Sequence, residues 1–220
     1  MKPSSYSNGT HSASVPTSLG RTYAYPRGVE LFRQGDRLQE VLEVVSGIVK
    51  LTQCDASGKQ SITGLAAEGD WLGTASVVAA RPSPNSAVTC CDALLRRVSS
   101  ASFKALLRRD PQLSLRIHQA HSRELCRQTT WLGQMCSLSS LQRLQCILCR
   151  IAAIQSVRAG GSTVRLQLPL HHWELAEFIG IRPEYLSRLM KEMEARNLIR
   201  RDKGWIVILD PKRLCDNAGL

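Results

Sequence analysis

The residues of this sequence best suited to specific chemistry are Glu184, Ser187 and Arg188, which stand at the spacing Glu-x-x-Ser-Arg. Residues three and four positions apart on a helix share one face, so these side chains would point the same way. An Arg guanidinium donates a pair of hydrogen bonds to guanine O6 and N7, and a carboxylate accepts one from cytosine N4. The set therefore suits the reading of base edges in DNA. The alternative is that Glu184 and Arg188 only form a solvent-exposed ion pair along one helix.

The sequence around these residues predicts a helix-turn-helix over residues 172–191. Two helices that cross steeply need a small residue where they meet, which is Ala176, and the turn needs a positive φ, which Gly180 tolerates. Apolar residues occupy the other positions that would face a shared core, namely Leu175, Ile179, Ile181, Leu186 and Leu189. With that core turned inward, the start of the second helix faces outward and is predicted to enter the major groove.

The sequence outside this motif predicts an α+β protein. Short apolar runs separated by turn residues fill residues 23–99, which is typical of an antiparallel β-roll, with strands expected at residues 41–45, 48–52, 61–65 and 87–89. We divide the chain into a flexible polar tail, a sensor β-roll, a dimerisation helix with a hinge, and a DNA-binding domain, at residues 1–22, 23–110, 111–138 and 139–220.

A long helix is predicted after Asp110-Pro111, because Asp is a good N-cap and Pro is favoured at the first helical position. Apolar or small residues then recur near heptad spacing, namely Leu113, Ile117, Ala120, Leu125, Leu132 and Met135. A helix this long exceeds what a small roll needs as cover. We therefore favour a coiled coil in a homodimer over a helix that only covers its own domain.

The C-terminal segment has the element order of a winged helix-turn-helix. Helices are expected at residues 141–154, 173–179 and 183–196, a loop at Ala159–Ser162, and strands at residues 164–168, 198–201 and 205–209. Asp202-Lys203-Gly204 joins the last two strands and suits a tight hairpin turn.

Together these features resemble the Crp/Fnr family of bacterial transcription regulators over residues 23–214. The glycines Gly35, Gly47, Gly69 and Gly73 of the cyclic-nucleotide-binding-like roll take part in the resemblance. The Glu-x-x-Ser-Arg residues are similar to those of the Fnr-like branch, whereas the Crp-like branch has Arg and Gly where this chain has Pro183 and Ser187. The resemblance implies a homodimer that binds a palindrome of TTGA-type half-sites in double-stranded DNA and contacts RNA polymerase.

The chain departs from this family at the two helix starts of the motif. The family usually has a Ser or Thr cap where this chain has His171 and Arg182, and each lost cap costs about 1 kcal/mol. Pro183 partly compensates because it presets φ for the helix. We expect His171, Arg182 and Lys191 to contact DNA phosphates, which orient a duplex without reading its sequence.

In cyclic-AMP-binding relatives a Gly-Glu pair and an Arg-Ser or Arg-Thr pair hold the phosphate. The corresponding effector-pocket residues here are Gly73, Thr74, Asn85 and Ser86, so the positive partner of a phosphate is missing. We predict an effector other than cyclic AMP, and a different cyclic nucleotide stays open. Oxygen-sensing relatives bind a [4Fe-4S] cluster through N-terminal cysteines, and residues 1–53 contain no cysteine, so the cofactor is unknown.

Eight cysteines in a chain without a secretion signal are expected to be reduced thiols. Four of them gather around the long helix and the hinge, namely Cys126, Cys136, Cys146 and Cys149. We favour burial of these thiols as small apolar side chains, and the alternative is a thiol redox switch or a metal site at the hinge. The tryptophans are interpreted as packing residues, namely Trp71, Trp131, Trp173 and Trp205.

The chain has 29 basic and 18 acidic residues, and its formal net charge of +11 favours a polyanionic partner. No apolar run approaches the roughly 20 residues that span a bilayer, so we expect a cytoplasmic protein without membrane contact. We do not expect an enzyme, because no nucleophile with an orienting partner stands out. The alternative function is an effector-binding protein, or a thiol or metal redox sensor, whose DNA-binding domain is weak or vestigial.

Overall fold

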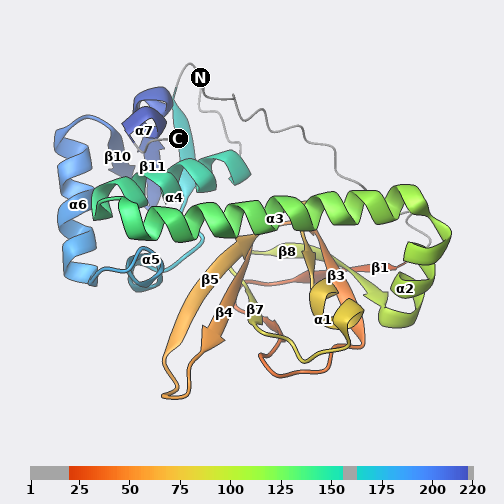
Figure 1. Ribbon diagram of the computed structural model, residues 1–220. Coiled ribbons are helices and arrows are strands. Elements are labelled where there is room, and N and C mark those ends of the chain that lie inside the picture. Colours follow the sequence, from red (N-terminus) through yellow and green to blue (C-terminus); the bar gives the residue numbers. More distant parts are fainter. Residues whose placement is uncertain (1–19, 156–162, 218–220) are drawn as a thin grey trace.

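The computed structural model describes residues 20–155 and 163–217, which form a β-roll, a long helix and a small domain with its own sheet (Figure 1). The roll consists of two antiparallel sheets of four strands each. One sheet has the strand order β1 (Arg21–Tyr25), β8 (Ala93–Ser99), β3 (Glu40–Ser46) and β6 (Trp71–Leu72). The other has the order β2 (Glu30–Phe32), β7 (Ser86–Thr89), β4 (Val49–Cys54) and β5 (Gln60–Ala66).

The predicted roll is confirmed, and its four expected strands end within two residues of the expected bounds. Apolar side chains of both sheets fill the space between them, including Leu42, Val49 and Leu95. The strand β1 begins at Arg21, so the predicted tail over residues 1–22 is too long at its C-terminal end. The rest of that tail lies outside the described residues.

The long helix α3 (Pro111–Ser137) begins at the predicted place. The Asp110 side chain accepts a hydrogen bond from the backbone N–H of Leu113 at 2.9 Å, and Pro111 occupies the first turn. Leu113 and Ile117 are buried in one cluster with Phe103 of the preceding helix α2 (Ser100–Arg109). Because these two residues cover the roll, their assignment to a dimer seam was wrong.

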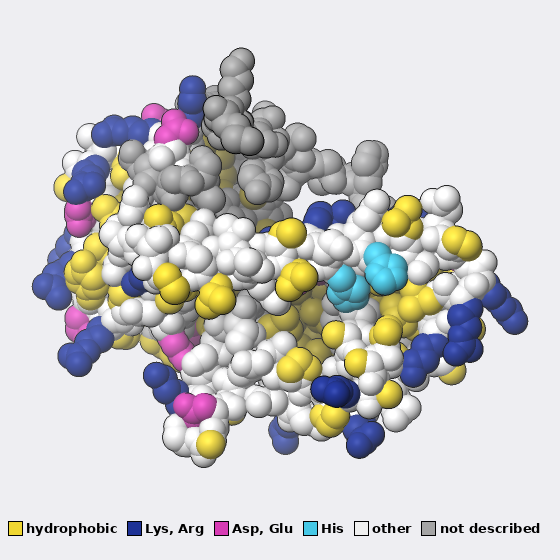
Figure 2. All heavy atoms as spheres, in the orientation of Figure 1, with side chains coloured by type: hydrophobic (Ala, Val, Ile, Leu, Met, Phe, Trp, Pro, Cys, Tyr) yellow, Lys and Arg dark blue, Asp and Glu magenta, His cyan; other side chains and the backbone are white. Residues whose placement is uncertain are grey.

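A different face of α3 leaves apolar side chains in solvent. Leu125 and Leu132 are 65% and 67% exposed, and Figure 2 shows separate hydrophobic side chains along this helix. They belong to an exposed stripe whose members alternate four and three positions apart, formed by His118, Ser122, Leu125, Thr129, Leu132 and Cys136. We call this set the α3 stripe. Its spacing is that of the a and d positions of a coiled coil.

The C-terminal domain has the predicted winged helix-turn-helix order. It consists of α4 (Ser140–Gln155), β9 (Val164–Gln167), α5 (His172–Phe178), α6 (Pro183–Ala195), β10 (Ile199–Asp202), β11 (Trp205–Ile208) and α7 (Pro211–Asn217). The sheet order is β10, β11, β9, and all pairs are antiparallel. The helix α7 was not predicted, and the expected loop at Ala159–Ser162 lies outside the described residues.

The roll and the C-terminal domain share one buried cluster. Ile48 and Leu65 of the roll are members of the cluster that contains Leu148 of α4 and Leu175 of α5. Arg150 of α4 adds a polar contact, because its Nη2 donates to the backbone carbonyl of Leu65 at 2.8 Å. The two domains are therefore packed together.

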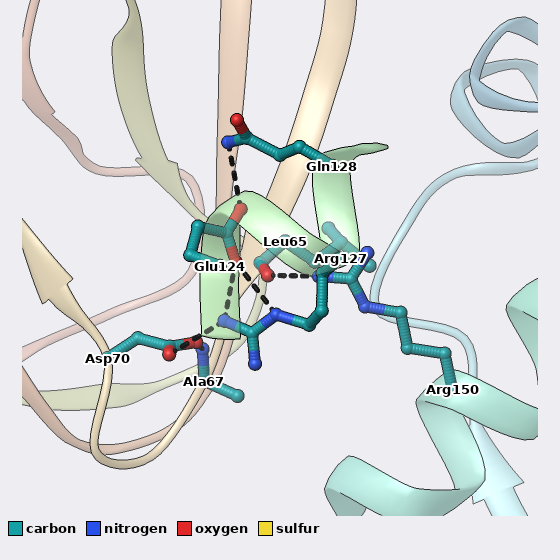
Figure 3. A network of polar contacts seen from close by, with 7 residues as sticks. All are labelled: Leu65, Ala67, Asp70, Glu124, Arg127, Gln128 and Arg150. Atoms are coloured by element: carbon teal, nitrogen blue, oxygen red, sulfur yellow. Dashed lines mark hydrogen bonds and ion pairs between the residues drawn. The ribbon is translucent and has the colours of Figure 1, made fainter. Parts of the chain in front are cut away.

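A polar network joins α3 to the roll at the same place (Figure 3). Arg127 Nη2 donates to Asp70 Oδ1 at 2.9 Å and also binds the Glu124 carboxylate, which accepts from Gln128 Nε2 at 2.9 Å. Burial lowers the pKa of nearby Arg150, and the positive charge of Arg127 acts in the same direction. The middle of α3 is thus held by charge as well as by packing.

Candidate nucleic-acid interface

The helix-turn-helix is built as its apolar pattern predicts. The predicted core positions Leu175, Ala176, Ile179, Leu186 and Leu189 are buried, and Ile181 is half-buried. Gly180 has a φ of 72°, a value that L side chains rarely adopt, so glycine is needed in this turn. The buried residues Leu186 and Leu189 fix one face of α6 against the core, so the opposite face of this helix lies on the outside of the domain.

The C-terminal end of α3 lies directly against this motif. The Trp131 ring packs on the Phe178 ring of α5 with centroids 5.1 Å apart. A Cβ on Gly180 would lie 3.0 Å from Met135 Cε, so the turn is in close contact with α3. Any displacement of α3 would therefore reach both α5 and the turn before α6.

The outward face at the start of α6 carries Glu184 and Arg188, which are both exposed. The ion pairs of the described residues include none between these two side chains. Instead, the Arg188 guanidinium lies over the Tyr185 ring, 5.2 Å from its centroid. Basic side chains gather over α6 at the left edge of Figure 2.

The other predicted contact residues surround this face. Ser187 is half-buried, and its Oγ donates to the carbonyl oxygen of Pro183 at 3.3 Å. Arg182, at the N-cap of α6, and Lys191, nine residues further along the chain, are exposed. His171 is exposed at the N-cap of α5, with its Nε2 3.4 Å from Arg27 Nη2 of the roll.

Glu174 has a role that the sequence did not reveal. Its side chain is only 4% exposed, and it forms an ion pair with Lys50 of β4, which is 19% exposed. Its second oxygen accepts a hydrogen bond from the backbone N–H of His171 at 2.7 Å, which is the glutamate half of a capping box at the start of α5. One carboxylate thus caps the first helix of the motif and fastens it to the roll.

The wing, which consists of β10 and β11, is joined to α6 by a second carboxylate. Arg201 of β10 donates to both oxygens of Glu194, from Nε at 2.9 Å and from Nη2 at 2.6 Å. These hydrogen bonds lower the pKa of Glu194. The wing and α6 are therefore oriented relative to each other.

Two exposed aromatic residues were missed or misread from the sequence. Trp173, which was interpreted as a packing residue, is 54% exposed at the first turn of α5. Tyr185 is exposed beside Arg188 on α6. The sequence could have predicted the exposure of Tyr185, because this residue follows the outward-facing Glu184 and precedes Leu186, which belongs to the apolar stripe of α6.

The predicted effector residues lie on two segments of the roll. Gly73 has a φ of 78° and Thr74 is buried at the start of α1 (Thr74–Ala79). The side-chain oxygen of Asn85 accepts a hydrogen bond from Thr63 Oγ1 at 3.2 Å. Ser86 Oγ accepts one from the backbone N–H of Gln34 at 2.9 Å. Asn85 Oδ1 and Ser86 Oγ thus each already accept a hydrogen bond within the protein.

The cysteines contradict the expectation of eight reduced thiols, because Cys149 of α4 forms a disulfide with Cys215 of α7. The expected burial is confirmed for Cys146, where it raises the pKa of the thiol to about 11, but it is wrong for Cys126 and Cys136, which are exposed on α3. Within the described ranges, no group of three or more His, Cys, Asp or Glu side chains is arranged to hold a metal ion. The four hinge cysteines are not brought together as one site.

Comparisons with known proteins agree with this architecture. A family model of the cyclic nucleotide-binding domain matches residues 23–110, and a model of the Crp-like helix-turn-helix domain matches residues 142–216. The chain is 25% identical to the transcriptional activator protein FnrL of Cereibacter sphaeroides over 204 residues, covering 89% of this chain and 79% of FnrL. It is 26% identical to the nitrogen fixation regulation protein FixK of Bradyrhizobium diazoefficiens over 202 residues, covering 89% and 81%.

Solved structures share the fold. FixK2 from Bradyrhizobium japonicum superposes with a TM-score of 0.78 at 18% identity, covering 90% of this chain and 96% of that chain. A Crp/Fnr-family transcriptional regulator from Thermus thermophilus gives a TM-score of 0.75 at 20% identity, covering 91% and 99%.

A cyclic-nucleotide-binding-like roll followed by a long helix and a winged helix-turn-helix defines a DNA-binding transcription regulator. The chain belongs to the Crp/Fnr family of such regulators. The relatives named above are regulators rather than enzymes, and a vestigial DNA-binding domain is not favoured. None of the helices in the described part of the chain is long and apolar enough to cross a membrane.

Proposed function

We propose that this regulator works as a homodimer that reads a palindrome of two TTGA-type half-sites through Glu184, Ser187 and Arg188. The observation that carries the proposal is the outward face of α6, where Glu184 and Arg188 are exposed while Leu186 and Leu189 are buried. If Glu184 and Arg188 formed an ion pair with each other along the helix, their side chains would be unavailable for contacts with bases. The described residues show no such pair, which favours base contacts.

Each side chain has a role that fits its chemistry. Arg188 donates to guanine O6 and N7, Glu184 accepts from cytosine N4, and Ser187 is short enough for a base edge or a phosphate. Arg182 lies at the N-terminus of α6, where backbone N–H groups and the helix dipole also attract a phosphate. His171 and Lys191 supply further phosphate contacts.

The α3 stripe supplies the dimer interface. Pairing two copies of α3 buries Leu125 and Leu132, the two most exposed of its apolar side chains. The contacts of α3 with the helix-turn-helix then link the dimer interface to both recognition helices. An effector bound in the roll acts by shifting the population between DNA-competent and incompetent dimers. Membership of the Crp/Fnr family supports RNA polymerase as a further partner. Access to bacterial DNA places the protein in the cytoplasm.

The experiment is a fluorescence anisotropy titration of a duplex that carries the palindrome. A base contact is worth about 1–3 kcal/mol, so Arg188→Ala and Glu184→Ala each weaken binding by about 5- to 150-fold. Arg109→Ala is the matched control, because Arg109 is an exposed arginine at the end of α2 in the sensor domain. Lys191→Ala lowers the slope of affinity against salt by about 1 without changing base preference. Wild-type affinity in Arg188→Ala would overturn the assignment.

A further inference from the structure

The C-terminal helix α7 is covalently fastened to α4 by the disulfide between Cys149 and Cys215, whose Cα atoms are 6.2 Å apart. Both residues are half-buried. A hollow of about 260 Å³ lies beside the pair and is otherwise lined by apolar residues, namely Ala152, Ala153, Val164, Ile208, Pro211 and Leu214. Both cysteines line this hollow, whose volume is large enough for a small oxidant or thiol.

The other nearby cysteine on α4 is poorly suited to this exchange. Cys146 precedes Cys149 by one turn, but it is 5% exposed, and burial raises its pKa to about 11. The thiolate is the reactive form of cysteine, so a thiol that stays protonated exchanges slowly. Geometry and reactivity together therefore select Cys149 and Cys215 as the partners.

The helix α7 shares a buried cluster with the recognition helix α6 and with the wing strand β11. Leu214 of α7 is fully buried in the same cluster as Leu189 and Met193 of the recognition helix α6. Ile208, at the end of the wing strand β11, belongs to that cluster too. Without the covalent link, α7 is a helix of 7 residues held only by its packing, and helices this short are marginal by themselves.

We propose that Cys149 and Cys215 form a reversible redox pair that makes DNA binding respond to thiol oxidation. With hydrogen peroxide, two S–H bonds and the O–O bond break, one S–S bond and two O–H bonds form, and two water molecules leave. Two electrons pass from the sulfur atoms to the peroxide oxygens. A dithiol reverses the change by two exchange steps and becomes a disulfide itself. The oxidised form holds α6 and the wing in place and binds DNA more tightly than the reduced form.

The pairing is tested by mass spectrometry on the full chain. After peroxide treatment and alkylation of free thiols, trypsin releases residues 144–150 joined to residues 214–220, and fragmentation assigns the bond to Cys149 and Cys215. The linked peptide disappears after dithiothreitol and is absent from Cys215→Ala. Cys54→Ala is the matched control, because Cys54 is an exposed thiol on the roll, and it keeps the linked peptide. Free Cys149 and Cys215 after peroxide treatment would overturn the proposal.

The effect on DNA is tested by comparing oxidised and reduced protein. Reduction weakens binding of wild-type protein by about 5-fold or more, and Cys215→Ala binds like the reduced protein whatever the oxidant. The proposal rests on DNA binding but not on the TTGA half-site, so affinity is measured on the palindrome and, at low salt, on an unrelated duplex. Failure on the palindrome alone would count against the half-site only. Equal affinity of both redox forms on both duplexes would overturn the redox coupling.

Discussion

The ion pair between Lys50 and Glu174 predicts a strong and asymmetric response to mutation. It joins the roll to α5, and the Glu174 side chain is 4% exposed whereas the Lys50 side chain is 19% exposed. Lys50→Met leaves the buried Glu174 carboxylate with a single hydrogen-bond donor, the backbone N–H of His171. Breaking a buried ion pair in this way lowers the free energy of unfolding by about 3 kcal/mol. Glu174→Gln costs less, about 1–2 kcal/mol, because Lys50 can turn its ammonium toward water and the amide oxygen still accepts from His171.

The assay is urea unfolding followed by tryptophan fluorescence, at one protein concentration because the protein is expected to be a dimer. The double variant removes both charges and is less destabilised than Lys50→Met, which gives a coupling free energy of about 2 kcal/mol in the double-mutant cycle. Glu40→Gln is the control, since it breaks the exposed pair with Arg97 and costs under about 1 kcal/mol. Simply additive costs for Lys50→Met and Glu174→Gln would refute a buried, coupled pair.

Three further outcomes are expected. Leu132→Glu puts a charge into the α3 stripe and raises the dimer dissociation constant about tenfold or more, which analytical ultracentrifugation measures; an unchanged dimer would place the interface elsewhere. The lowered pKa of Glu194 means that its pairing with Arg201 stabilises the fold above the ordinary Glu pKa of about 4.5, and this is lost as pH falls through the folded value. Thermal midpoints between about pH 6 and about pH 3 should therefore fall more steeply for wild type than for Glu194→Gln, and parallel curves would contradict this. Iodoacetamide at about pH 8 should label Cys54, exposed on the roll, early and Cys90 late, because burial raises the pKa of Cys90 to about 12; early labelling of Cys90 would show an open core.

The helix-turn-helix could be predicted from the sequence because its requirements are local. A period of 3.6 residues places Leu175, Leu186 and Leu189 on one core, and the turn demands a residue that tolerates positive φ, which is Gly180. The outward position of Glu184 follows from the same pattern.

The packing of the long helix α3 was predicted less well because the helix has two apolar faces. A heptad pattern does not tell which face covers the helix's own domain, so Leu113 and Leu132 were assigned to one seam although Leu113 is buried in the roll. Contacts between distant segments have no local signal at all. Lys50 and Glu174 are 124 positions apart, and Cys149 and Cys215 are 66 apart.

Reading of a palindrome by a dimer is tested by the affinity of the protein for the TTGA palindrome before and after five base pairs are inserted between the half-sites. Two recognition helices of one dimer read half-sites about 10 base pairs apart, and an insertion of half a turn moves one half-site to the opposite face of the duplex. We expect the insertion to reduce affinity to that for an unrelated duplex, on the order of a thousandfold weaker. Equal affinity with and without the insertion would contradict a dimer that reads a palindrome.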